Sequence, residues 1–149
     1  MRTIKIKPVC VTGKCRAGLR LEDEVQIRGV NLENPGQSRV CCHAFSHFSP
    51  VISTLQHGDH FYAVATCPDC QCNGPRGARV DFLLGHADKW ELCQAIVAYR
   101  QLRERVPEPA AARQLRAAAV EHQKRGEFVE AAEKMYAALA VMEEMVTAR

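Results

Sequence analysis

The chain has 149 residues, 47% of them hydrophobic, and a formal charge of +3 at neutral pH. This length suits one ordinary domain or a small domain with an appendage, and the apolar content argues against a disordered chain. The first residues alternate in polarity and do not form the apolar core of a signal peptide, and no apolar run approaches the roughly 20 residues that span a bilayer. We therefore expect a cytoplasmic protein that does not enter a membrane.

The positive charge is small and scattered. Residues 1–85 contain ten Lys or Arg and seven Asp or Glu, whereas residues 86–149 contain ten of each kind. The sequence has no basic stripe interleaved with aromatic side chains, so we do not expect it to bind nucleic acid.

The first part of the chain is rich in Gly, Pro and Cys and has short strand-like runs. Alternation and β-branched residues predict strands at residues 3–11, 25–30, 61–65 and 78–84, and helical periodicity predicts a helix at residues 42–57. Pro8 is expected to make the first strand an edge strand or to end its regular pairing. Pro50 either kinks the helix or marks a later start near Ser49.

The second part of the chain has a different texture, which begins near Gly85. It contains almost no Gly and is rich in Ala, Glu and Arg, and its periodicity predicts helices at residues 87–105, 110–125 and 127–147. Pro107 and Pro109 separate the first two helices, and Gly126 fits a helix C-terminus between the last two. The fold class predicted is α+β: a small mixed, Cys-rich β/α domain at residues 1–85, followed by a three-helix segment at residues 86–149.

The last two predicted helices carry an apolar stripe. Residues 126–139 are similar to the second helix of a tetratricopeptide repeat, and the resemblance extends over about residues 113–146. Only one repeat is present, so a plain antiparallel helical hairpin fits the same pattern. The stripe must be buried on the helix of residues 87–105, on the N-terminal domain or on a partner, so we expect a protein partner or self-association through these helices. The stripe comprises Phe128, Met135, Leu139, Met142 and Val146.

Seven of the eight cysteines lie in the first 85 residues, in three groups. Thiols clustered beside histidines, in a chain expected to be cytoplasmic, indicate a metal centre or thiol chemistry more than a disulfide scaffold. His86 and His122 are expected on the surface. The three groups are Cys10 and Cys15; Cys41 and Cys42, followed by His43 and His47; and Cys67, Cys70 and Cys72.

Cys67 and Cys70 form a C-x-x-C pair directly after a predicted strand, as in a metal knuckle. Zinc takes four Cys or His ligands in a tetrahedral site, and iron–sulfur clusters take mostly cysteines. A second C-x-x-C pair is missing. The same pair could serve as a redox dithiol, although the residues that follow do not begin a helix, or the cysteines could be small buried apolar residues.

Three local patterns occur in order along this part of the chain. Together they resemble a family of small bacterial and archaeal proteins known mainly as uncharacterised, with motifs of the forms K-C-x-A-G-H, C-x-x-A-F and C-P-D-P, over about residues 4–84. The resemblance implies that Cys15, Cys41 and Cys67 belong to one site. Leu19 stands where the family often has His, and Cys70 where it usually has Pro. The patterns are Lys14-Cys15-Arg16-Ala17-Gly18 followed by Glu22-Asp23-Glu24, Cys41-Cys42-His43-Ala44-Phe45, and Thr66-Cys67-Pro68-Asp69.

The sequence therefore predicts a cytoplasmic protein that binds zinc or an iron–sulfur cluster, which the residues do not separate, as an accessory or small subunit of a larger system. Its metal ligands are expected to be Cys15, Cys41 and Cys67, completed by Cys70 or His43. One alternative is a thiol redox protein that uses Cys67 and Cys70. Another is a protein interaction module with a structural metal. No catalytic motif is present, so the chain's standing as an enzyme stays open.

Overall fold

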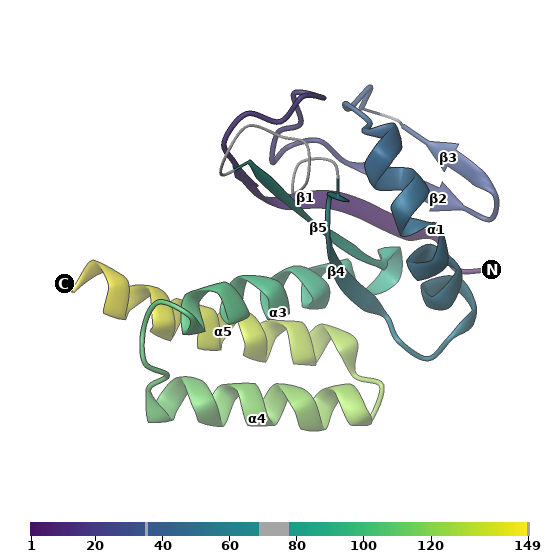
Figure 1. Ribbon diagram of the computed structural model, residues 1–149. Coiled ribbons are helices and arrows are strands. Elements are labelled where there is room, and N and C mark those ends of the chain that lie inside the picture. Colours follow the sequence, from purple (N-terminus) through teal and green to yellow (C-terminus); the bar gives the residue numbers. More distant parts are fainter. Residues whose placement is uncertain (35, 69–77, 149) are drawn as a thin grey trace. The chain divides into compact units, whose positions relative to one another are not determined.

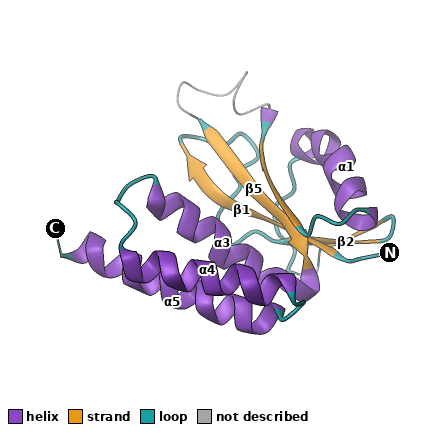
Figure 2. Cartoon of the chain, turned by 90° about the horizontal axis from the view of Figure 1, so that it is seen from below, coloured by secondary structure: helices purple, strands orange, loops and turns teal. Residues whose placement is uncertain are grey.

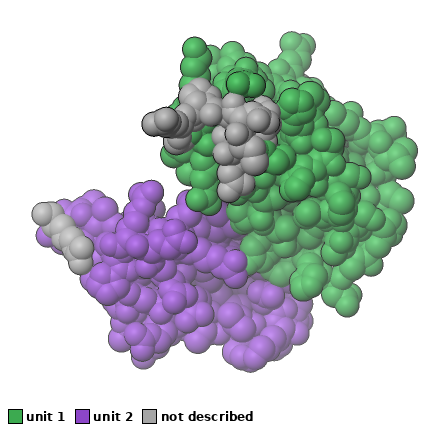
Figure 3. All heavy atoms as spheres, in the orientation of Figure 1, with its two compact units in different colours: residues 1–88 green, residues 89–149 purple. Residues whose placement is uncertain are grey.

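A computed structural model describes residues 1–34, 36–68 and 78–148, and the chain divides into two compact units, residues 1–88 and 89–149 (Figures 1 and 3). The architecture is α+β, as the sequence predicted, with a mixed first unit and a helical second unit. The first unit contains β1 (Ile4–Thr12), β2 (Val25–Arg28), β3 (Asn31–Glu33), α1 (Cys42–His57), β4 (Tyr62–Thr66) and β5 (Arg79–His86). The turn η1 (Ala87–Lys89) leads to α3 (Trp90–Arg103), α4 (Ala110–Lys124) and α5 (Phe128–Thr147).

The described strands of the first unit form one five-stranded antiparallel sheet in the order β3-β2-β1-β5-β4. Figure 2 shows β1 and β5 side by side within it. Strand β1 lies in the centre, where Ile4 pairs with Ile27 of β2 on one side and with His86 of β5 on the other. The chain makes a meander through β1, β2 and β3, crosses the sheet through α1, and returns along β4 and β5. Strands β3 and β4 are therefore the two edges of the sheet.

The prediction that Pro8 makes β1 an edge strand is wrong, because β1 is the central strand. The other expectation, that Pro8 ends regular pairing, holds in part, because pairing with β5 continues to Thr12 in a shifted register. Pairing with β2 covers only residues 4–6, and the register with β5 shifts between Pro8 and Cys10, as at a β-bulge. A proline lacks the N–H that a two-sided ladder needs, so the central strand accommodates Pro8 at an irregularity.

The single strand predicted at residues 25–30 is also wrong, because the chain reverses within it. Arg28 of β2 pairs with Asn31 of β3, which leaves Gly29 and Val30 as a two-residue hairpin loop. Gly29 has a φ of +63°, a conformation that glycine adopts without steric cost. Val30 is 93% exposed at the tip of this loop. Its apolar side chain therefore belongs to a turn, although the sequence predicted a strand there.

Helix α1 begins at Cys42 and contains Pro50 in its interior, so the alternative of a start near Ser49 is wrong. Its buried residues recur every three or four positions, and they pack on one face of the sheet. The ring of Phe48 meets the ring of Phe82 edge to face, with centroids 5.0 Å apart. This core contains Ala44, Phe48, Ile52 and Leu55 of α1 and Ile4, Ile6, Val80, Phe82 and Leu84 of the sheet.

His86, which we expected on the surface, is only 1% exposed. The alternation along β5 places it on the same side as Val80, Phe82 and Leu84. Its Nε2 lies 2.8 Å from the carbonyl oxygen of Leu55, a hydrogen-bonding distance that links the end of β5 to the last turns of α1. Burial of this imidazole is thus part of the α1–sheet packing.

The described part of the second unit, residues 89–148, contains three helices, and α5 packs against both α3 and α4. Small buried residues, among them Ala119 and Ala138, let α4 and α5 approach closely. Met135 and Met142 of the predicted stripe are buried at 4% and 0% exposure, whereas Val146 is 46% exposed. The stripe is therefore covered within this unit at its centre. None of the helices in the described residues is long and apolar enough to cross a bilayer.

Gly126 ends α4 as the sequence predicted. Its N–H donates to the carbonyl of Gln123, the N–H of Glu127 donates to the carbonyl of His122, and both distances are 3.0 Å. With Gly126 at a φ of +79°, these bonds form the Schellman motif that commonly closes a helix. The motif turns the chain directly into α5.

Candidate thiol site

Two cysteines that are far apart in the sequence meet at the end of the core. Cys41 is the residue that caps α1, and Cys67 directly follows β4. Both side chains lie in one buried cluster, close enough for Cys67 to raise the pKa of the Cys41 thiol. Both are buried, with 8% of Cys41 and none of Cys67 exposed. The structure therefore brings together two of the residues that the sequence proposed as metal ligands.

Regular backbone pairing fixes the position of each thiol. The N–H of Cys67 donates to the carbonyl of Val80 at 2.8 Å, which extends the β4–β5 ladder by one residue. The carbonyl of Cys41 accepts the N–H of Phe45 at 3.1 Å, which is the first helical hydrogen bond of α1. The pair thus stands on the end of a strand and the start of a helix, both of which are anchored in the core.

The pKa of the Cys41 thiol is raised above its ordinary value, mainly because burial penalises the thiolate. The backbone amides of Ala44 and His43 lower it in part, and the neighbouring Cys67 raises it further. The net direction means that Cys41 is protonated at neutral pH. It is therefore not an activated nucleophile, and a bound cation would have to displace its proton.

Cys15 lies in the connection between β1 and β2. It is half-buried and packs against the same core cluster that contains Cys41 and Cys67. Its carbonyl accepts the N–H of Gly18 at 3.0 Å in a tight turn, and Gly18 has a φ of +64°. The three cysteines that the family resemblance groups together thus all border one cluster, although only Cys41 and Cys67 are shown in contact.

The remaining proposed ligands are His43 and Cys70. His43 is exposed in the first turn of α1, and Cys70, with Cys72, lies outside the described residues. Within residues 1–34, 36–68 and 78–148, no group of three or more Cys, His, Asp or Glu side chains is close enough to hold a metal ion. Cys93 is buried in α3 of the second unit, as expected for an apolar helix position.

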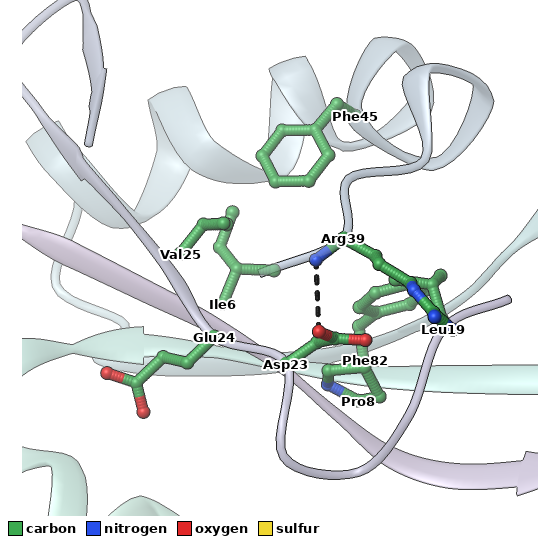
Figure 4. Close-up of a pocket in the computed structure, with 9 residues that line it drawn as sticks. All are labelled: Ile6, Pro8, Leu19, Asp23, Glu24, Val25, Arg39, Phe45 and Phe82. Carbon is green, nitrogen blue, oxygen red and sulfur yellow. Dashed lines mark hydrogen bonds between the residues drawn. The ribbon is translucent and has the colours of Figure 1, made fainter. Parts of the chain in front are cut away.

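A small cavity lies beside Pro8, where the β1–β2 pairing has ended (Figure 4). It holds about 10 Å³, which admits at most one water molecule. Leu19, 5% exposed, lies in its wall at the position where the resembled family often has His. The side chain that could have supplied an imidazole ligand here is apolar.

Asp23 organises this region, a role that its place in the acidic run Glu22-Asp23-Glu24 does not reveal. It is 8% exposed, its Oδ2 accepts the N–H of Arg20 at 2.8 Å, and its Oδ1 accepts the N–H of Arg39 at 3.0 Å (Figure 4). These bonds tie the loop after Cys15 to the segment that leads into Cys41. Asp23 is thus a structural carboxylate that connects two loops of the first unit.

Comparisons of the chain with protein-family models, with curated proteins and with solved structures give no match.

Proposed function

We propose that this chain is a cytoplasmic metal-binding protein whose site holds zinc or an iron–sulfur cluster. The observation that carries the proposal is the contact between the buried thiols of Cys41 and Cys67. Soft sulfur donors that converge from two elements are what zinc and iron–sulfur centres require. Two converging thiols are half of a tetrahedral site, so further ligands must complete it.

Cys15 is the third ligand in this proposal, because it packs against the same core cluster. Cys70 or His43 is the fourth. Thiolates packed in one apolar place repel one another unless a cation neutralises them, so a metal would lower the pKa that burial raises at Cys41. The site would then act as a structural or electron-transferring centre in an accessory subunit, with no catalytic residue assigned.

Metal analysis of the full chain tests this proposal. We expect protein purified without oxygen to contain about one zinc ion per chain, or iron and acid-labile sulfide in cluster proportions. Cys41→Ser should lose most of the metal, whereas Cys42→Ser, which changes the exposed neighbouring thiol, should keep it. A folded wild-type protein that neither contains nor takes up zinc or iron would refute the proposal.

A docking role for the helical hairpin, similar to a single tetratricopeptide repeat, is a second candidate. Met135 and Met142 are internal, so a partner would have to use other residues of α5. Val129 and Tyr136, two turns apart on α5, are 71% and 39% exposed and favour this role. If the hairpin mediates self-association, light scattering after size exclusion should show a dimer that Val129→Glu dissociates; a monomeric wild-type protein would argue against self-association.

A further inference from the structure

We propose that Cys41 and Cys67 form a reversible disulfide, and that this pair, rather than Cys67 with Cys70, is the redox dithiol of the chain. The inference concerns the thiols of the metal site proposed above, but it does not require that metal binds. It rests on the direct contact between the two thiols, on their shared burial and on the two elements that carry them.

The two sulfurs already have the neighbourhood that a disulfide needs. A disulfide can form without large backbone movement only where the two Cβ atoms approach closely. Cys41 and Cys67 belong to one buried cluster, and the side chain of Cys67 acts directly on the Cys41 thiol. The pair is held by the first hydrogen bond of α1 and by the last pairing of β4 with β5. Oxidation would therefore join two elements that are already packed together.

The reaction balances with a small-molecule disulfide as the oxidant, and glutathione disulfide is the probe. The Cys41 thiolate, from the less completely buried of the two residues, attacks one glutathione sulfur, and a glutathione thiolate leaves. The Cys67 sulfur then attacks the mixed disulfide and releases the second glutathione. Two electrons and two protons pass from the cysteine pair to two glutathione thiols.

The burial of Cys41 and Cys67, and the exposure of the neighbouring Cys42, determine the order in which these thiols react with glutathione disulfide. Cys42, the first residue of α1, is exposed, so it should react first and form a mixed disulfide with glutathione. The Cys41–Cys67 bond should form more slowly, by roughly tenfold or more, because both side chains are buried and access to them requires local opening. Once formed, a bond in this buried position should resist reduction better than the exposed mixed disulfide.

Disulfide mapping of the full chain in a glutathione redox buffer tests the proposal. The protein is first reduced and treated with EDTA, so metal does not protect the thiols, and is later quenched with acid and alkylated. Trypsin cleaves after Arg39 and next after Arg76, which leaves both cysteines on one peptide, so cleavage after Phe45 and Phe61 by chymotrypsin is also needed. The expected result is a dominant cross-link between Cys41 and Cys67 that persists in Cys42→Ser and in Cys70→Ser.

Each result of this mapping experiment either supports the proposal or overturns it. A cross-link from Cys67 to Cys70, glutathione on Cys42 without any cross-link, or no oxidation at all would overturn the proposal. Cys41→Ser should abolish the cross-link. If that variant does not fold, fragment spectra of the wild-type peptides identify which two sulfurs are joined. Failure of the metal-content experiment would leave this result unaffected, so the two proposals can fail separately.

Discussion

Gly126 closes α4 with a backbone conformation that residues with a Cβ rarely adopt. A methyl group added there would meet no atom within 4 Å, so the cost of Gly126→Ala comes from its φ of +79° alone. We expect this change to lower the free energy of unfolding by about 1 kcal/mol. Gly126→Asn should cost less, because asparagine tolerates the left-handed region. Urea denaturation measures both variants, and equal losses for Ala and Asn would contradict this explanation.

Glu108 is a carboxylate of the helical unit with several bonding partners. Its Oε1 accepts the hydroxyl of Tyr99 at 2.6 Å and the Nε of Arg116 at 2.9 Å, and 12% of its side chain is exposed. The hydrogen bond from Tyr99 is the largest cause that lowers the pKa of Glu108. Burial and this bond together raise the pKa of Tyr99 to about 12.

The stability that Glu108 supplies should depend on pH in one direction. Because its folded-state pKa is depressed, the contribution is present above the ordinary value of about 4.5 and is lost as pH falls through the folded pKa. Glu108→Gln should cost about 1–2 kcal/mol at pH 7 and flatten the loss of stability below pH 4.5. Thermal melts between pH 3 and 7 give the measurement. Parallel pH profiles for the two proteins would show that the carboxylate does not contribute.

At the scale of elements, the burial of α5 distinguishes its two faces. Met135 is 4% exposed and Val129 is 71% exposed on the same helix. Met135→Glu should destabilise the protein by at least about 3 kcal/mol, because it places an unpaired charge in the core of the unit. Val146→Glu, at a position of α5 that is 46% exposed, is the matched control and should leave the melting temperature nearly unchanged. A Met135→Glu protein that melts like the wild type would mean that α5 is not packed as described.

The elements that the sequence predicted are those with a clear period. Alternation found β1, β4 and β5, and the spacing of Phe48, Ile52 and Leu55 found α1. Strand β3 was missed because it has three residues and no apolar alternation. The central position of β1 was missed because proline usually occurs in edge strands. Pro8 lies at a β-bulge, where a proline is also tolerated in an inner strand.

The sequence grouped the cysteines of the candidate site through a resemblance, and it did not predict how they are arranged. The resemblance grouped Cys15, Cys41 and Cys67, and these residues border one cluster. The contact between Cys41 and Cys67 depends on α1 crossing the sheet and on β4 pairing with β5, which local patterns do not reveal. Asp23 was missed for the same reason, since its partner Arg39 comes from another loop.

At the scale of the whole molecule, a ligand that binds only the folded state stabilises it. If zinc occupies the site, a free concentration 100-fold above the dissociation constant should add about 2.7 kcal/mol to the free energy of unfolding. Cys42→Ser should respond like the wild type, and Cys41→Ser should not respond. Melting curves with and without zinc, with EDTA as the baseline, measure the effect. A shift of the same size in Cys41→Ser would place zinc elsewhere on the chain.

The central position of β1 determines when the first unit can fold. Ile4 pairs with His86 and Thr12 with Arg79, so a strand made at the start of synthesis waits for one made at the end of the unit. Until β5 is available, the meander of β1, β2 and β3 has an open edge, and α1 lacks Val80, Phe82 and Leu84 against which to bury its apolar face. Sheets built on such distant contacts fold in milliseconds to seconds, whereas helices joined by short turns fold in microseconds to milliseconds. The N-terminal unit, although synthesised first, should therefore be the slower of the two to reach its native structure.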